Sequence, residues 1–256
     1  MGKVLIVATN HDSLKQTPET TGLWFSELTN FYDKLKTRHY MTVISPKGGN
    51  IPIDHRSLTG LFKSHKLRKY YRAPGFQRLL QESLSPKDVK AADYDAIYFT
   101  GGHGTMWDFP ESKELQQLTR EIYENGGVVA AVCHGPAALL NVKLSDGTYL
   151  IQNKTVTGYS DREETASFNK HEIPYSLEEQ LKNRALTYHK AKIPFKGHVE
   201  EDDRVITGQN PASVKGVAKA VINRLEQKAF AEHPDSFRAV LRISVEDQIL
   251  RRKPAP

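Results

Sequence analysis

The chain has a single cysteine, Cys133, in 256 residues. One cysteine cannot form a disulfide within the chain and cannot build a metal site from several thiolates. The chain has no apolar run near the roughly 20 residues that a membrane-spanning helix needs, and its apolar start is too short for a secretory signal. These absences predict a cytoplasmic protein with no membrane contact.

Acidic residues are missing between Asp54 and Glu82. In a chain of net charge +6, this stretch holds seven basic residues, which are Arg56, Lys63, Lys66, Arg68, Lys69, Arg72 and Arg78. Such a run can bind nucleic acid or phosphate groups. Because a solvated surface has the same composition, we expect a basic lobe inserted at about residues 50–92, and no nucleic-acid partner for the stretch 56–78.

Short apolar runs alternate with segments of helical periodicity along most of the chain. The runs predict strands at residues 3–9, 40–46, 93–100, 128–133, 154–160 and 204–208, and the periodic segments predict helices at 23–36, 112–127, 175–186 and up to about 225. This alternation predicts an α/β domain over residues 1–227 with a doubly wound, mostly parallel sheet and helices on both faces.

Residues 228–256 have a pattern of their own. Apolar side chains recur there at close to helical spacing, at Phe237, Val240, Leu241, Val245 and Ile249. The spacing predicts an amphipathic helix in a C-terminal extension, packed on the protein's own body or on a partner subunit, because a free helix would expose a sticky patch.

Polar residues follow four of the predicted strands at the point where each strand ends. They are Gly101-Gly102-His103, Cys133-His134, Tyr159-Ser160-Asp161 and Gly208-Gln209-Asn210. In a doubly wound sheet, ligands bind at the carboxyl ends of the strands. The four groups therefore predict one functional site.

Cys133 lies where the run "VVAAVCHGPAAL" turns from a strand toward a helix-like segment. A strand, a sharp turn and a helix around one nucleophile form a nucleophile elbow. A helix N-terminus aimed at the sulfur predicts a lowered pKa for the thiol. The backbone N–H of His134 and those of the glycines after the preceding strand are candidate donors to a developing oxyanion.

His134 needs a third group that orients its ring if it is to act with Cys133. The pattern alone leaves four acids possible, which are Glu27, Asp161, Glu163 and Glu164. The histidines His55, His65 and His103 do not show the spacing of a metal site, so we expect no metal.

Five blocks together resemble the ThiJ/PfpI superfamily, which is related to class I glutamine amidotransferases. The blocks are "TGLWFSE", "FTGGHGTMWDFP", "VVAAVCHGPAAL", "TGYSDREE" and "VITGQNPAS". They stand in the right order between Lys3 and Gln227, and they are most similar to the heat-shock chaperone and glyoxalase III branch.

The resemblance implies a flavodoxin-like fold, a homodimer and a conversion of methylglyoxal to lactate that needs no cofactor. It matches the nucleophile to Cys133, the neighbouring histidine to His134, a proton-carrying acid to Glu27 and the acid that holds the histidine to Glu164. The block around Gly101, Gly102 and His103 matches the pocket that binds substrate and the oxyanion.

Two other functions remain possible for such a chain. One is a stress-protective holdase chaperone whose thiol is vestigial or senses redox state. The other is a cysteine amidase or peptidase of the same superfamily. Turnover of methylglyoxal without glutathione distinguishes the first interpretation, a small-aldehyde enzyme, from both.

Overall fold

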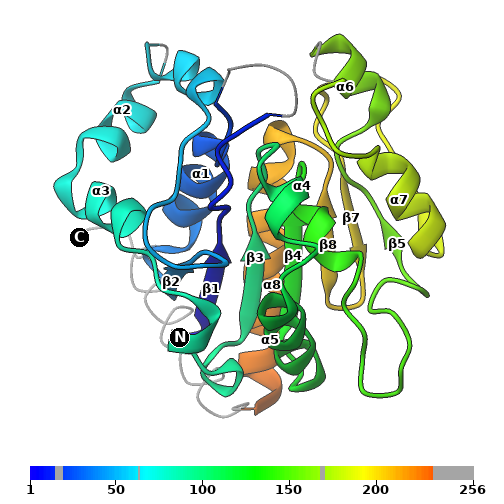
Figure 1. Ribbon diagram of the computed structural model, residues 1–256. Helices are drawn as coiled ribbons and strands as arrows, with labels where there is room; N and C mark the ends of the chain where they lie inside the picture. Colours follow the sequence, from blue (N-terminus) through cyan, green and yellow to red (C-terminus); the bar gives the residue numbers. More distant parts are fainter. Residues whose placement is uncertain (15–19, 63, 168–170, 233–256) are drawn as a thin grey trace, which may run out of the picture.

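The protein is built around a central sheet of six strands. The computed structural model describes residues 1–14, 20–62, 64–167 and 171–232. The strands are β1 (Lys3–Val7), β2 (Tyr40–Ile44), β3 (Ala96–Phe99), β4 (Val128–Val132), β7 (Val199–Asp202) and β8 (Val205–Gly208). They lie in the order β2-β1-β3-β4-β8-β7, and every pair is parallel except β7 with β8 (Figure 1). The predicted flavodoxin-like, doubly wound sheet is confirmed.

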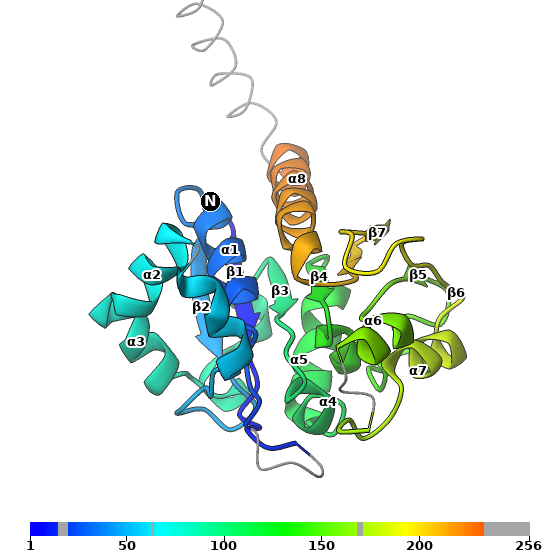
Figure 2. The same cartoon turned by 90° about the horizontal axis from the view of Figure 1, so that it is seen from above.

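Helices cover both faces of this sheet. α1 (Phe25–Leu35) and α8 (Val214–Glu232) lie on one face, and α4 (Thr105–Asp108) and α5 (Lys113–Glu124) lie on the other (Figure 2). Because both faces are covered, the inner strands have no solvent side, and all five residues of β4 are buried. This is why these strands are apolar throughout instead of alternating.

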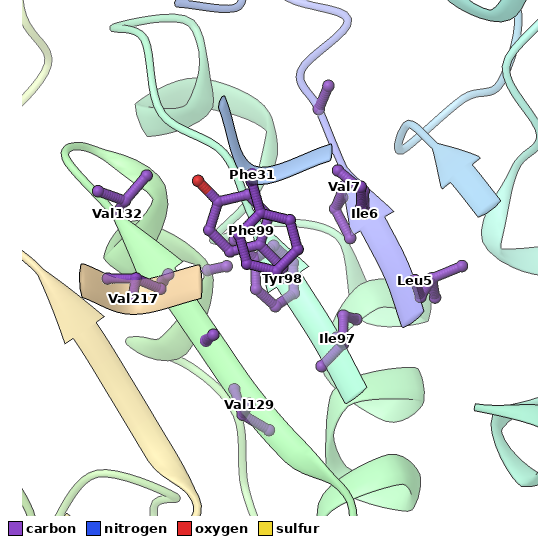
Figure 3. Close-up of a cluster of buried hydrophobic side chains, with 14 of the residues drawn as sticks. Leu5, Ile6, Val7, Phe31, Ile97, Tyr98, Phe99, Val129, Val132 and Val217 are labelled. Atoms are coloured by element: carbon purple, nitrogen blue, oxygen red, sulfur yellow. The ribbon is translucent and has the colours of Figure 1, made fainter. Parts of the chain in front are cut away.

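The core fixes α1 against the middle of the sheet (Figure 3). Phe31 of α1 stacks on Tyr98 of β3, with ring centroids 3.7 Å apart and planes 7° apart. The hydroxyl of Tyr98 donates to the carbonyl oxygen of Glu27 at 3.3 Å. α1 therefore has a fixed position over β3, and Glu27 is placed with it.

The lobe at residues 50–92 consists of short helices. They are η1 (His55–Phe62), α2 (His65–Arg72), α3 (Pro74–Gln81), η2 (Pro86–Asp88) and η3 (Ala91–Asp93), where η marks a 3₁₀ helix. Phe76 of α3 packs edge-on against Phe25 of α1, and Asp33 of α1 accepts hydrogen bonds from Tyr70 and Lys66 of α2. Part of the lobe's basic charge is thus paired within the chain.

The prediction of a sheet strand over residues 154–160 was wrong. Only Thr155–Val156 is a strand, β5, and it pairs with β6 (Thr187–Tyr188) in a separate two-stranded sheet. The free edge of β8 is already occupied by β7. Thr157 contacts β8 through its backbone N–H, which donates to the side chain of Thr207. Two helices flank β5 and β6 in this region, α6 (Asp161–Ala166) and α7 (Leu177–Arg184).

The start of β1 and the end of α8 are held by one carboxylate. Asp95 accepts a hydrogen bond from the backbone N–H of Lys3 at 3.0 Å and from Nζ of Lys228 at 2.9 Å. α8 continues to Glu232. The helix predicted over 237–249, like Lys63 of the basic run, lies outside the described residues. No helix among the described residues is long and apolar enough to cross a membrane.

Candidate active site

Residues of three of the polar groups line a small cavity, and Pro211, which comes directly after the group that follows β8, lines it as well. β3, β4 and β8 of the central sheet each deliver one group, and the fourth is carried by the segment after β5, where Tyr159 N–H donates to the carbonyl oxygen of Cys133 at 2.8 Å. The cavity has a volume of about 150 Å³ and is lined by Trp24, Gly102, His103, Cys133, His134, Tyr159, Ser167, Phe195 and Pro211. A larger hollow beside His11 and Trp107 does not include Cys133, so we place the site at the smaller one, which does.

Cys133 stands immediately after β4 in a left-handed backbone conformation, with φ at 60°. Its N–H still bonds to the carbonyl oxygen of Gly208 at 2.9 Å, so the chain turns sharply just after the last strand contact. A non-glycine residue in this region is strained, and such strain gathers at functional sites. The predicted elbow is therefore present at Cys133.

The helix predicted after the elbow is short. It is a five-residue 3₁₀ helix, η4 (Gly135–Leu139), closed by i→i+3 bonds such as that from Ala137 N–H to the carbonyl oxygen of His134. Its residues are all buried, so the chain turns in the core instead of extending along the sheet. The predicted helix N-terminus beside the sulfur is therefore that of a short 3₁₀ helix, which has fewer aligned peptide dipoles than an α-helix of several turns.

The expected lowering of the thiol pKa was wrong. Cys133 is 3% exposed, and burial raises the pKa of its thiol well above the ordinary value, with the carboxyl group of Glu27 raising the pKa further. A buried site favours the uncharged form of an acid. At neutral pH the thiol therefore holds its proton until a base removes it.

Glu27 lies fully buried on α1, beside the cysteine. Its Oε2 accepts the backbone N–H of Gly101 at 2.6 Å, and its Oε1 has no hydrogen-bond partner in the described part of the chain. Burial raises the pKa of Glu27 to about 8, although the Gly101 N–H and the Cys133 thiol lower it in part. Glu27 thus carries a proton at neutral pH and can both donate and accept near that pH.

The two glycines after β3 leave the space that this arrangement needs. A Cβ at Gly101 would lie 2.7 Å from Cβ of Cys133 and 2.7 Å from Oε2 of Glu27, so no side chain fits between them. Gly102 has φ at +106°, a conformation that glycine adopts readily. The Gly101 N–H, expected to face a substrate oxygen, is used by Glu27.

His134 bridges the thiol and a carboxylate. Its Nδ1 lies 3.3 Å from Sγ of Cys133, and its Nε2 lies 2.5 Å from Oε1 of Glu164. Since a carboxylate accepts, Nε2 carries the proton and the Nδ1 lone pair faces the sulfur. Burial lowers the pKa of His134, and the histidines hold the pKa of Glu164 below its usual range although burial alone would raise it.

The other acids that the pattern left possible do not reach His134. Asp161 accepts from the hydroxyl of Ser176, and Glu163 accepts from the side chains of Gln209 and Asn210. The structure brings together Cys133, His134, Glu27 and Glu164, the four that the resemblance implied.

Several residues of the site were not predicted from the sequence. Phe195, in the left-handed region with φ at 63°, lines the cavity, as do Ser167 and Pro211. Arg56 reaches His103 from the lobe, with Nη2 lying 3.2 Å from Nδ1. No motif marks Phe195, and in the sequence Arg56 is one of seven similar basic residues.

Three side chains at the site have the chemistry of metal ligands. Ligand atoms of His103, His134 and Glu164 all lie within 4.8 Å of one another. A guanidinium can only donate, so Nδ1 of His103 must accept from Arg56 and its Nε2 must carry the proton. A metal ion between the three residues would need the lone pair on that Nε2, so the donor set does not suit one.

The fold and the site define a class of protein. It has a flavodoxin-like sheet whose central strand ends in a strained, buried cysteine with a histidine and two carboxyl groups around it. Residues 27–224 match the DJ-1/PfpI family, and the chain belongs to this family.

Similar proteins cover most of the chain. The glutathione-independent glyoxalase Hsp31 of Saccharomyces cerevisiae is 31% identical over 232 residues, covering 88% of this chain and 98% of the relative. The crystal structure of glyoxalase III from Candida albicans superposes with a TM-score of 0.79 at 27% identity, covering 87% of this chain and 97% of the other. The Rapid Encystment Protein of Francisella tularensis (24 kDa) superposes with a TM-score of 0.84 at 38% identity, covering 88% and 99%.

Proposed function

We propose that this protein is a glutathione-independent glyoxalase that converts methylglyoxal and water to lactate. The observation that carries the proposal is the pair formed by Cys133 and Glu27, a nucleophile beside a buried carboxyl group whose pKa is raised to about 8. An acid–base group works best when its pKa lies near the working pH. The relatives named as glyoxalases support the reaction class.

The first step forms a bond between Sγ of Cys133 and the aldehyde carbon of methylglyoxal. As this bond forms, Nδ1 of His134 takes the thiol proton, which removes the need for a preformed thiolate. The resulting imidazolium is stabilised by Glu164 at Nε2. The aldehyde oxygen then takes a proton from the imidazolium, and the product is a hemithioacetal.

The second step moves the hydrogen from the aldehyde carbon to the neighbouring carbon. For this step, Glu27 must be ionised. Its carboxylate removes the proton from the former aldehyde carbon to give an enediol and returns that proton to the adjacent carbon. The hydroxyl proton of the hemithioacetal moves to the former ketone oxygen. The result is a lactoyl thioester on Cys133. Water then adds to the thioester carbon, the C–S bond breaks, and lactate leaves as the thiol is restored.

Charge that develops on the substrate oxygen needs donors. Because Gly101 N–H is bonded to Glu27, we assign this role to the backbone N–H groups of Gly102 and His134, both of which border the cavity. The same proposal includes a homodimer that acts in the cytoplasm, which the resemblance and the sequence composition favour.

The test is an assay of D/L-lactate formed from methylglyoxal in the absence of glutathione. We expect turnover by the wild type, none by Cys133→Ala, and a loss on the order of 10²-fold in Glu27→Gln. Glu179→Gln is the matched control, because Glu179 is an exposed glutamate on α7. Full activity in Cys133→Ala would overturn the mechanism. Suppression of protein aggregation with no lactate formed would favour a holdase, and amide hydrolysis would favour an amidase.

A further inference from the structure

The basic lobe reaches the active site through one residue, Arg56. Its side chain is 22% exposed and its Nε and Nη2 donate to the two oxygens of Asp54, at 2.9 and 2.5 Å. Asp54 is fully buried and also accepts from the hydroxyl of Thr21 at 3.0 Å. A bidentate pair of this kind fixes the plane of a guanidinium, so the direction in which Nη2 of Arg56 points is fixed.

Nη2 of Arg56 points to Nδ1 of His103, which lies 3.2 Å away. Because the guanidinium has donors only, it holds His103 in the neutral form that is protonated on Nε2. Nε2 in turn lies 3.1 Å from Oε2 of Glu164 and donates to it. The other oxygen of Glu164 receives Nε2 of His134 at 2.5 Å. Each oxygen of this carboxylate is thus held by one imidazole.

His103 must stay neutral and protonated on Nε2 if Glu164 is to serve as the counter-charge of His134. If the proton of His103 moved to Nδ1, a lone pair would face Oε2 and the carboxylate would lose one of its two holders. If His103 were charged, it would compete with His134 for the negative charge of Glu164. The donor from Arg56 opposes both changes, since each puts a proton on the nitrogen that Arg56 contacts.

We propose that Arg56 is a positioning residue for the glyoxalase reaction, which locks the tautomer of His103 so that Glu164 stays aimed at His134. The inference rests on the proposed function. Arg56 acts through His103 and does not touch the substrate. Within the described part of the chain, His103 faces the titratable groups of Arg56, Glu164, His134 and Tyr159, the last with ring centroids 6.3 Å apart.

The experiment must avoid leaving Asp54 as an unpaired buried charge, which would destabilise the fold. The test variant is therefore Asp54→Asn/Arg56→Met, and its background is Asp54→Asn, in which Arg56 keeps its donors and still has one side-chain oxygen of residue 54 to hold it. Arg78→Gln, an exposed arginine of the same lobe, is the control for charge. Thermal melting establishes that each variant is folded.

The first measurement is nitrogen-15 NMR of the histidine side chains, with His103 assigned from its absence in His103→Gln. We expect His103 to be protonated on Nε2 in the wild type and in Asp54→Asn, and to sample both tautomers in the double variant. An unchanged His103 spectrum in the double variant would overturn the inference. This measurement needs no turnover, so it stands even if the protein is not a glyoxalase.

The second measurement is the pH dependence of methylglyoxal turnover. Relative to Asp54→Asn, the double variant should lose about tenfold or more in kcat with KM within about twofold. Because the double variant lacks the donor that opposes a proton on Nδ1 of His103, the acidic limb of kcat/KM should move relative to that of Asp54→Asn. A loss of kcat with an unmoved acidic limb would show a merely structural role. Absence of turnover in the wild type would overturn the proposed function. The NMR result would then still test whether Arg56 fixes the tautomer of His103.

Discussion

Glu163 and Glu164 are consecutive and both buried, yet their carboxylates serve different parts of the molecule. Glu164 accepts from the two imidazoles at the site, whereas Glu163 accepts from Ser160, Gln209, Asn210 and the backbone N–H of Phe195. One carboxylate belongs to the chemistry, and its neighbour ties the loop after β8 and the segment carrying Phe195 to α6.

This division predicts that the same substitution affects stability at Glu163 and turnover at Glu164. Glu163→Gln places an amide N–H₂ against groups that donate, so it should lower the free energy of unfolding by about 1–3 kcal/mol. Glu164→Gln should lower kcat at least tenfold, because the imidazolium of His134 loses its counter-charge. Urea unfolding and lactate assays on both variants check this. Equal losses of activity and of stability in the two variants would contradict the division.

Gly101 should tolerate no side chain. In Gly101→Ala the new Cβ would lie 2.7 Å from both Cys133 and Glu27, so the pair must separate and turnover should fall by about 10²-fold or more. The control is Gly75→Ala, where a Cβ meets nothing within 4 Å. We expect this control to keep its activity and to melt at or above the wild-type temperature. Wild-type kinetics in Gly101→Ala would show that the close approach is unimportant.

Glu27 should make stability fall as the pH rises. Its pKa is about 8 in the folded protein and near 4.5 when exposed, so between these values the native state binds more protons than the unfolded state. The free energy of unfolding should then decline with increasing pH, by on the order of 1 kcal/mol per pH unit. Above about pH 8 the decline should end.

Glu27→Gln removes this dependence, so the difference between the two proteins isolates it from other titrating groups. Urea unfolding at several pH values between 5 and 9 measures that difference. A wild-type curve that runs parallel to that of the variant would contradict a raised pKa for Glu27.

The thiol of Cys133 should resist alkylation at neutral pH. Burial first, and then the charge of Glu27, raise its pKa, so the rate with iodoacetamide should climb only above the free-thiol value of about 8.5. Stopped-flow alkylation against pH measures this. In Glu27→Gln the charge is absent and the apparent pKa should be lower than in the wild type. Rapid labelling at pH 6 would contradict the raised pKa.

Local patterns were enough to predict much of the fold. The apolar runs of β1, β3 and β4 and the glycine turn before His103 are signals within a few neighbouring residues. β5 could not be predicted in its true place, because its exclusion from the central sheet depends on β7 occupying the edge of β8. The sequence of a single strand does not indicate which of two strands will pair with a given sheet edge.

The site shows the same limit. The elbow at Cys133 follows from its own segment, but Glu27 and Glu164 were distinguished from other acids only by family resemblance. The direction of the thiol pKa depends on burial by elements that are distant in sequence. Arg56 could not be chosen from among similar basic residues, since its partners Asp54 and His103 meet it only in the folded chain.

The left-handed backbone at Cys133 lowers the stability of the fold at the position where the reaction needs a thiol. A side chain at φ of 60° costs about 1 kcal/mol relative to glycine, so Cys133→Gly should be more stable than Cys133→Ala, although glycine is normally the weaker choice in a folded chain. The fold on its own therefore favours a residue with no side chain at the position where a nucleophile stands. Directed selection for thermal stability alone would be expected to remove the thiol there, and selection for turnover to restore it.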